Sequence, residues 1–183
     1  MQIKTTLRGR EFVFETKPGL FSKEHVDPGS LLLIENMAVK NGDTVIDLGC
    51  GYGAIGLSMA SLIPNGKVYM VDTDIRAVEY SKRNAQLNQI KNVEIVASDG
   101  YANLPKDLKC DLIVSNPPSH TPKETIIEFI EGAKNRLNEG GKLYFVTEKR
   151  ISPMIKREFV RVFGNHETVN SKLQYVLSMA IKE

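Results

Sequence analysis

The amino-acid sequence predicts an α/β fold: a doubly wound, mostly parallel sheet of seven strands with helices on both faces. Three features of the chain predict it. From residue 43 onward, short apolar runs alternate with stretches of helical composition, which is the pattern of βαβ units. A glycine-rich turn, Val45–Gly56, links the first run to the first helix. Two β-forming runs, 166–169 and 174–181, end the chain and predict an antiparallel hairpin.

The N-terminal part of the chain precedes this alternation. β-Forming residues cluster at 2–7 and 11–16 around Arg8-Gly9-Arg10, so an N-terminal β-hairpin is expected. An apolar helix is expected to follow, with Asp27 as its N-cap and Pro28 in its first turn.

The alternation supplies the remaining elements in order. Strands are expected near 44–48, 67–71, 92–96, 111–115 and 142–147. Helices are expected near 54–63, 74–88, 123–138 and 153–162. This order predicts a Rossmann-like sheet with crossover helices on both sides. The 183 residues contain no repeat and no linker, so we expect a single domain, 1–183.

Composition narrows the class of protein. Hydrophobic residues make up 42% of the chain, and no apolar run approaches the roughly 20 residues that span a bilayer. The two cysteines, Cys50 and Cys110, lack metal-ligand spacing, so we expect no metal site and a reducing, cytoplasmic location. Residues 140–183 hold 8 Lys and Arg against 4 Asp and Glu, which favours either a solvated basic face or a rim that faces a polyanion.

The glycine-rich turn has the composition of a ligand-binding loop. Asp47 ends the first strand, and Gly49, Gly51, Gly53 and Gly56 follow it. Glycine permits positive φ and lets a ligand approach the backbone without meeting a Cβ atom. The helix that follows presents free N–H groups to the same ligand.

The glycine spacing fits two cofactors. Gly51, Gly53 and Gly56 match a dinucleotide fingerprint, and Asp72 lies about 20 residues further on, where a ribose-binding carboxylate belongs. The pattern Asp47-x-Gly49-x-Gly51-x-Gly53 instead resembles motif I of class I methyltransferases that use S-adenosylmethionine (SAM). A structural turn that binds nothing is the third alternative.

A second motif decides in favour of SAM. Asn116-Pro117-Pro118 follows the strand at 111–115, so it should face the crevice of the glycine turn. An amide oxygen beside a rigid proline carbonyl can accept both N–H groups of a planar amine and aim its lone pair at a methyl group. Such chemistry needs no strong base. Asn116→Asp keeps the acceptor and the size but adds charge, and adenine-type members of the methyltransferases that this motif resembles use Asp here, so partial activity is expected.

These motifs resemble the amino-methyltransferase branch of the class I SAM-dependent enzymes. Phe21-Ser22 and Asp27-x-Gly29-Ser30-x-Leu32-Leu33 are further similar to the small-subunit ribosomal RNA guanine-N2-methyltransferases, the "methyltransferase small" domain family. The resemblance covers nearly the whole chain, and it implies that residues 1–30 form a hairpin and a substrate-side segment.

The resemblance implies a role for each residue of the motifs. The cofactor residues would be Asp47, Gly49, Cys50, Gly51, Gly53, Asp72, Thr73, Asp99, Gly100 and Asn116, with Tyr101 beside Asp99. The catalytic residues would be Asn116, Pro117 and Pro118, and the substrate residues Phe21, Ser119, Lys149 and Arg150. Ser119 departs from the pattern, because this position is often aromatic, so Phe21 or Tyr52 would have to stack on the target base.

Some roles stay open between structure and function. Asp74 could share the ribose with Asp72, but a helix cap is the expected role, and His120 could act as a base beside Asn116, but an exposed loop residue is expected. Lys149 and Arg150 fit phosphate contacts and solvated charge equally well.

The sequence therefore predicts a SAM-dependent N-methyltransferase for a base of structured RNA, with guanine N2 of small-subunit ribosomal RNA as the first choice. The partner would be ribosomal RNA or the small ribosomal subunit, with neither a membrane nor a metal, and either a monomer or a homodimer is compatible. The alternatives are a glutamine N5 or adenine N6 methyltransferase, a catalytically silent SAM- or RNA-binding module and, least favoured, a nicotinamide oxidoreductase.

Overall fold

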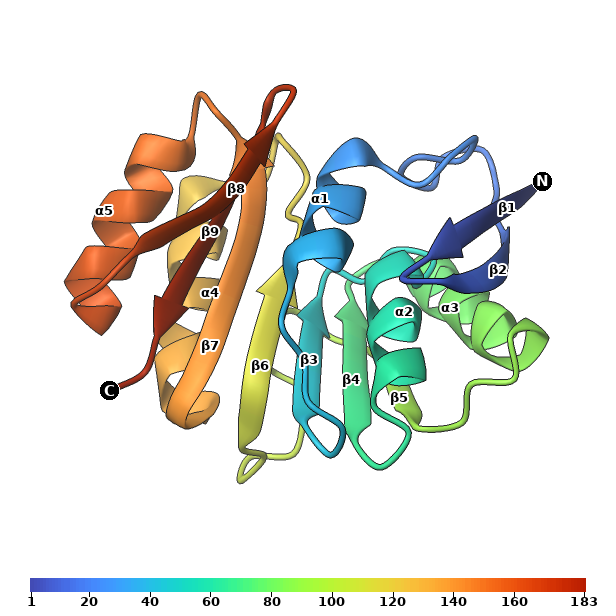
Figure 1. Ribbon diagram of the computed structural model, residues 1–183, viewed down its shortest axis with the longest axis horizontal. Coiled ribbons are helices and arrows are strands. Elements are labelled where there is room, and N and C mark those ends of the chain that lie inside the picture. Colours follow the sequence, from blue (N-terminus) through green and yellow to red (C-terminus); the bar gives the residue numbers. More distant parts are fainter.

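The computed structural model describes residues 1–183 and contains two sheets (Figure 1). The small sheet pairs β1 (Gln2–Leu7) with β2 (Arg10–Glu15). The strands of the large sheet are β3 (Thr44–Leu48), β4 (Lys67–Asp72), β5 (Val93–Ala97), β6 (Cys110–Ser115), β7 (Leu137–Glu148), β8 (Glu167–Lys172) and β9 (Tyr175–Ile181). The helices are α1 (Pro28–Asn36), α2 (Ala54–Leu62), α3 (Ile75–Leu87), α4 (Lys123–Arg136) and α5 (Ser152–Phe163).

The large sheet confirms the predicted doubly wound topology. Its strand order is β5-β4-β3-β6-β7-β9-β8, and the five strands from β3 to β7 run parallel. β9 runs antiparallel to both β7 and β8, which is the predicted terminal hairpin. The strand order reverses between β3 and β6, and the carboxyl ends of both strands lie at the upper edge in Figure 1.

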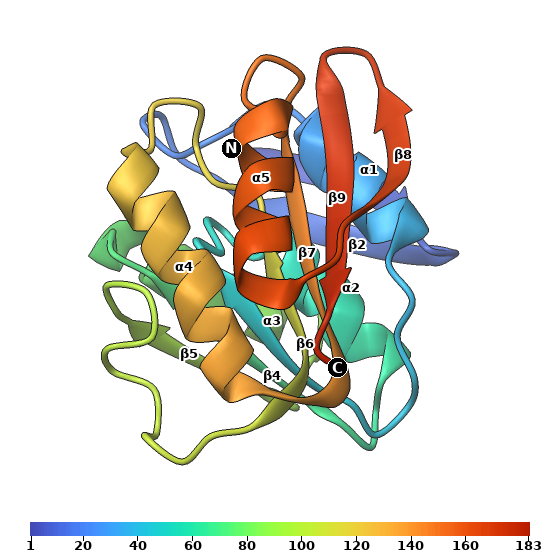
Figure 2. The ribbon, with the colours of Figure 1, turned by 90° about the vertical axis from the view of Figure 1, so that its left-hand side faces the viewer.

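Each face of the sheet has its own core. Helices α1 to α3 and the small sheet cover one face, where Val45 of β3 packs. Helices α4 and α5 lie side by side on the other face, where Ile46 and Leu48 pack (Figure 2). β3 is therefore apolar on both sides, as a central parallel strand requires. None of the helices has the length and apolar composition needed to cross a membrane.

The N-terminal hairpin is held against α3 by two asparagine side chains. Asn84 accepts from the Glu15 N–H at 2.7 Å and donates to the Glu15 carbonyl at 3.1 Å. Asn88 makes the same pair of bonds with Val13, at 3.0 and 2.8 Å. These amides satisfy the outer edge of β2 as a neighbouring strand would, so the segment that follows is directed to the upper edge of the large sheet (Figure 1).

Two boundaries differ from the predictions for a non-local reason. β7 starts at Leu137 and contains an irregularity opposite β6, whereas the sequence predicts a strand from 142. The Gly140 N–H donates to the Lys182 carbonyl at 2.7 Å, so the end of the chain defines this part of the strand. β8 likewise extends to Lys172, and the turn is made at Leu173, whose φ is 55°.

Candidate active site

A cavity of about 390 Å³ lies at the point where the strand order reverses. The glycine turn after β3 and the ends of β4, β5 and β6 contribute to its wall. The segment before α1, the start of α1 and the first half of α4 complete it. Ligands of open α/β sheets bind at this place, so the fold and the two sequence motifs converge on one cavity.

The four glycines of the turn divide into two pairs. Gly49 and Gly51 line the cavity with φ of 72° and 57°, and a Cβ atom on either would meet no atom within 4 Å. A Cβ at Gly53 would lie 3.2 Å from the Met70 side chain, and one at Gly56 only 2.7 Å from it. The missing Cβ atoms of Gly49 and Gly51 therefore leave room for a ligand, and those of Gly53 and Gly56 leave room for packed side chains. Gly53, predicted to contact the cofactor, lies outside the cavity wall.

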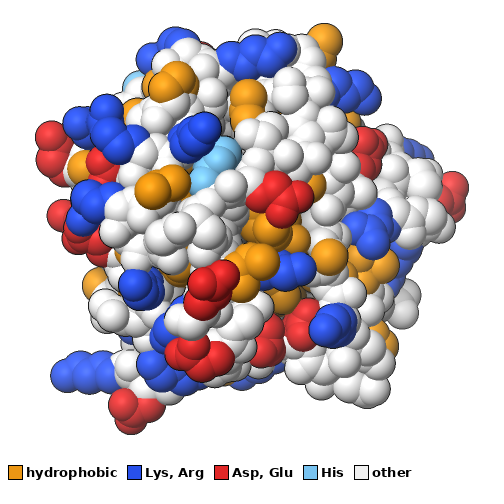
Figure 3. All heavy atoms as spheres, turned by 60° about the vertical axis from the view of Figure 1, so that its left-hand side comes forward, with side chains coloured by type: hydrophobic (Ala, Val, Ile, Leu, Met, Phe, Trp, Pro, Cys, Tyr) orange, Lys and Arg blue, Asp and Glu red, His pale blue; other side chains and the backbone are white.

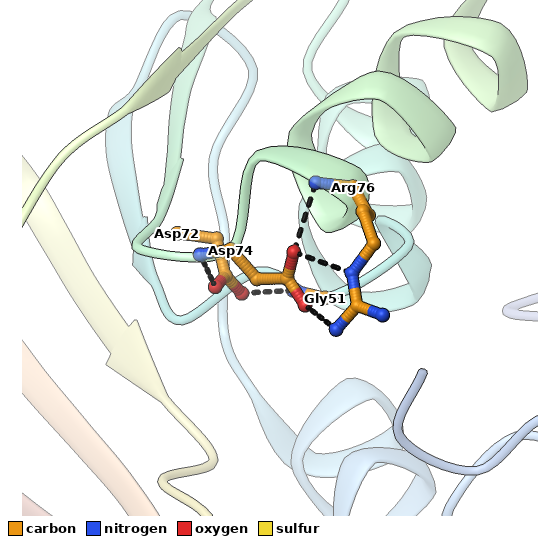
Figure 4. Close-up of polar contacts among 4 residues, drawn as sticks. All are labelled: Gly51, Asp72, Asp74 and Arg76. Atoms are coloured by element: carbon orange, nitrogen blue, oxygen red, sulfur yellow. Dashed lines mark hydrogen bonds and ion pairs between the residues drawn. The ribbon is translucent and has the colours of Figure 1, made fainter. Parts of the chain in front are cut away.

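Asp72 connects the glycine turn to the start of α3 (Figure 4). Its Oδ2 accepts from the Gly51 N–H and its Oδ1 from the Asp74 N–H, both at 2.9 Å. Asp74 instead caps α3 by accepting from the Arg76 N–H, and it pairs with the Arg76 guanidinium at 2.7 Å. The prediction that Asp74 is a helix cap is confirmed, and Asp72 is the carboxylate that faces the cavity.

Asp47 lies behind the cavity wall. It is fully buried, and neither carboxylate oxygen has a hydrogen-bond partner. Burial raises the pKa of Asp47 to about 7, and the charge of Asp72 adds to the increase. The backbone N–H of Gly56 offsets part of it, although its geometry falls short of a hydrogen bond. An orphaned carboxylate beneath the glycine turn is suited to a ligand with a positive charge.

Most of the other residues predicted to bind the cofactor also line the cavity. Thr73, Asp99, Gly100 and Cys50 all line it. Tyr101 does not, because its ring packs on Gly132 and its hydroxyl donates to the Phe129 carbonyl at 2.7 Å. The expectation that Tyr101 lies beside the cofactor is therefore not met, and the Phe129 side of α4 closes the cavity instead.

Asn116 presents one side of its carboxamide to the protein and the other to the cavity. Its Nδ2 donates to Asp27 Oδ2 at 2.8 Å and to Ser30 Oγ at 2.9 Å. Its Oδ1 accepts no hydrogen bond from the protein. The Pro118 carbonyl accepts from the Thr121 N–H at 2.9 Å, whereas the Pro117 carbonyl accepts none. Asn116 Oδ1 and the Pro117 carbonyl are thus the free acceptors that the sequence predicts.

Two further polar residues of the wall, Asp27 and Ser30, were missed as site residues, and Tyr52, named only as an alternative stacking ring, lines the wall with them. Asp27 and Ser30 line the cavity from the start of α1, although the sequence indicated only a helix cap for Asp27. Tyr52 is 5% exposed and lines it as well. Burial and the nearby Asp27 charge raise the pKa of the Tyr52 hydroxyl. The Asp27-x-Gly29-Ser30 motif was the signal that could have placed the first two.

Of the four predicted substrate residues, only Phe21 lines the cavity. Phe21 lines it and is 51% exposed, and His120 lines it from an exposed loop, as predicted for that histidine. Ser119, Lys149 and Arg150 are exposed and lie outside the wall. Arg150 donates to the Ser119 carbonyl at 2.9 Å and pairs with Glu148 at 2.8 Å, so it supports the loop after the Asn-Pro-Pro motif.

The arrangement of sheet, glycine turn and Asn-Pro-Pro motif defines a class I methyltransferase. Residues 11–178 match the methyltransferase small domain family, and the chain belongs to that family. The resemblance inferred from the motifs is thereby confirmed.

The relatives include proteins that modify both ribosomal subunits. The chain is 36% identical to the uncharacterised protein YbxB of Bacillus subtilis, over 96% of this chain and 89% of that protein. It is 33% identical to the ribosomal RNA large subunit methyltransferase G of Shewanella amazonensis, over 89% of this chain and 44% of the relative. A 16S rRNA N2 methyltransferase of T. thermophilus, solved with AdoMet and guanosine, superposes with a TM-score of 0.91 at 28% identity. That match covers 100% of this chain and 50% of the solved one, so the chain spans about half of each ribosomal RNA methyltransferase.

Proposed function

We propose that this chain is a SAM-dependent N-methyltransferase that acts on the exocyclic amine of a base in structured RNA, with guanine N2 of small-subunit ribosomal RNA as the target. One observation carries the proposal. Asn116 Oδ1 and the Pro117 carbonyl are free acceptors at the same cavity as the glycine turn. Two fixed acceptors match the two N–H groups of one planar amine.

The residues of the cavity fit SAM. The open space beside Gly49 and Gly51 accommodates a ligand against the backbone, and a Cβ atom would fill it. Each oxygen of Asp72 accepts one backbone N–H and retains a lone pair for a ribose hydroxyl. Asp99 is exposed in the wall and can accept from an adenine amino group. When bound, SAM supplies an electrophilic methyl group on its sulfonium.

The chain contributes orientation and electrostatic stabilisation to the transfer. An aromatic exocyclic amine is a poor nucleophile, because its lone pair is delocalised into the ring. Hydrogen bonds from its two N–H groups to Asn116 Oδ1 and the Pro117 carbonyl localise that lone pair and hold it in one direction. The acidity of the amine rises as the new bond forms, so the proton can leave to water afterwards. The neighbouring His120 is therefore not required as a base.

The mouth of the cavity is suited to an unpaired nucleotide of a polyanion. Exposed Phe21 offers a ring on which a base can stack, and Lys149 offers a cation at the rim. Figure 3 shows several Lys and Arg side chains along the upper edge of the molecule, and the carboxyl ends of β3 and β6 lie at the upper edge of the sheet in Figure 1. A base within a duplex could not enter, so the target must be single-stranded or flipped out.

The proposal is tested by methylation of separated ribosomal subunits. Subunits from a strain of the source organism that lacks this gene are incubated with labelled SAM and either the parental protein or Asn116→Ala. Digestion and mass spectrometry should identify N2-methylguanosine in the small-subunit RNA, formed by the parental protein only. N2-methylguanosine in the large subunit would support the activity and change the target. N6-methyladenosine or N5-methylglutamine would replace the proposal, and SAM binding without any product would indicate a silent module.

A further inference from the structure

We propose that Asp27 is a positioning residue that fixes which end of the Asn116 carboxamide faces the target amine. The inference rests on the proposed function for the role of Asn116. Asp27 lies at the start of α1, 89 residues before Asn116 in the chain, and is 6% exposed. Its Oδ2 accepts from Asn116 Nδ2 at 2.8 Å, at the end of the amide opposite the free Oδ1.

Of the two partners of Asn116 Nδ2, only Asp27 can distinguish its two orientations. Ser30 Oγ, at 2.9 Å, is a hydroxyl that donates as well as it accepts. It would therefore bind either the nitrogen or the oxygen of the amide. An ionised carboxylate only accepts, so a flipped amide would bring Asn116 Oδ1 against Asp27 Oδ2 with no proton between them. Asp27 thereby keeps Nδ2 inward and Oδ1 toward the cavity.

The surroundings of Asp27 hold its carboxylate in place for this contact. Its Oδ2 also accepts from the Ser30 N–H at 3.0 Å, and its Oδ1 accepts from the Tyr175 hydroxyl at 3.3 Å. A Cβ atom at Gly29 would lie 2.9 Å from Asp27 Oδ2 and 3.0 Å from the Tyr175 ring, so this position requires glycine. Each residue of the Asp27-x-Gly29-Ser30 motif thus has a role at Asn116. Asp27 and Ser30 bind its amide nitrogen, Gly29 leaves room for them, and Tyr175 of the C-terminal hairpin holds Asp27.

Two substitutions separate the positioning role from the capping role of Asp27. Asp27→Asn retains an oxygen for both the Ser30 N–H and Asn116 Nδ2, while its own amide can donate to the Tyr175 hydroxyl. Asp27→Ser retains a good N-cap, but its side chain is too short to reach Asn116. Asn, Asp and Ser cap helices about equally well, so the two variants should unfold at similar temperatures. They should differ in their effect on Asn116 and in the bond to the Tyr175 hydroxyl, which only Asp27→Asn keeps.

The first measurement needs neither SAM nor RNA. In ¹H–¹⁵N spectra, the side-chain amide of Asn116 is identified by its loss in Asn116→Ala. In the parental protein and in Asp27→Asn, its two protons should exchange slowly and lie away from the exposed-asparagine position. In Asp27→Ser they should collapse to that position. If Asp27→Ser keeps the parental signals, the proposal is wrong, whether or not the protein methylates RNA.

The second measurement follows the reaction on whichever substrate the parental protein methylates. Asp27→Ser should lower kcat by roughly 10- to 100-fold, the scale of a misplaced orienting group, with SAM affinity and Tm unchanged. Asp27→Asn should stay within a few-fold of the parent. In the Asn116→Ala background, Asp27→Ser should cause no further loss, because its effect passes through Asn116. Equal kcat for Asp27→Ser and Asp27→Asn, or additive losses with Asn116→Ala, would overturn the proposal.

A separate variant covers the possibility that Asp27→Ser does not fold. Ser30→Ala removes the partner that cannot distinguish the two orientations and leaves the Asp27 contact in place. It should keep the shifted Asn116 signals, and its kcat should fall less than tenfold. If Ser30→Ala loses those signals, the orientation does not depend on Asp27 and the proposal fails.

Discussion

Replacing Asp47 with asparagine should stabilise the protein, and increasingly so as the pH rises. The parental side chain is fully buried and both of its oxygens lack partners. Its pKa is raised to about 7, chiefly because burial disfavours the charged form. An asparagine has nearly the same shape and never becomes charged, so Asp47→Asn removes the titration and leaves the packing.

The sign and size of the effect follow from the two pKa values. The carboxyl has a pKa of 3.8 in its ordinary environment and about 7 in the folded protein. Because the folded state binds the proton more tightly, the unfolding free energy of the parent should fall as the pH rises from about 4 to about 7. The total loss is about 4 kcal/mol, and about 2.5 kcal/mol of it falls between pH 5 and pH 8.

The assay is urea unfolding of both proteins, without SAM, at several values between pH 5 and pH 8. The difference in unfolding free energy, variant minus parent, isolates residue 47, because every other side chain is the same in both proteins. At pH 5 this free-energy difference includes the constant cost of burying an amide. The prediction is the increase of the difference between pH 5 and pH 8. For a chain of this length it corresponds to about 5–10 °C in Tm. A difference that does not change with pH refutes the reasoning.

The remaining predictions concern the cofactor turn and the rim. Gly51→Ala should weaken SAM binding more than tenfold in calorimetry. Both Gly51→Ala and Gly53→Ala are strained by a positive φ, but Gly53→Ala should lower Tm further, because only its Cβ meets packed side chains. Asp72→Asn should raise the Kd for SAM by roughly 10-fold or more, since an amide cannot accept both backbone N–H groups and has no charge for the ribose; an unchanged Kd would exclude it as the ribose ligand. Lys149→Glu should weaken RNA binding and flatten its salt dependence while single-turnover chemistry stays intact. Arg150→Glu should also slow that chemistry, because this side chain supports the loop after the Asn-Pro-Pro motif.

The sequence predicts the fold almost completely because the signals are local. Each strand of the parallel sheet is an apolar run of its own, and each helix carries its own cap or turn residues. The predicted strand boundaries are wrong where a strand pairs with residues that are distant in the sequence. β7 starts with a -Leu-Asn-Glu-Gly-Gly- stretch that looks like a loop, and contacts with Cys110 and Lys182, both distant in the chain, make it part of the sheet. No window of neighbouring residues contains that information.

The candidate site divides in the same way. Residues whose role depends on their own motif, such as Gly51, Asp72 and Asn116, could be placed on the cavity wall from spacing alone. The roles of Asp27 and Tyr175 could not, because they depend on a contact across 148 residues. Spacing also cannot separate Gly49 from Gly53, since both have positive φ and only the packing shows which one faces open space.

The expected activity of Asn116→Asp changes once the contact between Asp27 and Asn116 is known. From the sequence, the variant keeps an acceptor of the right size and should be partly active. In the structure, one oxygen of the new carboxylate would replace the Nδ2 that now lies 2.8 Å from Asp27 Oδ2. Two carboxylates at that distance cannot both be ionised, so one must take up a proton or the side chain must turn away. We therefore expect kcat of Asn116→Asp to fall about 10²-fold. Single-turnover rates of the variant, divided by those of the parent, measure the loss. A ratio near one would show that Asp27 does not constrain residue 116.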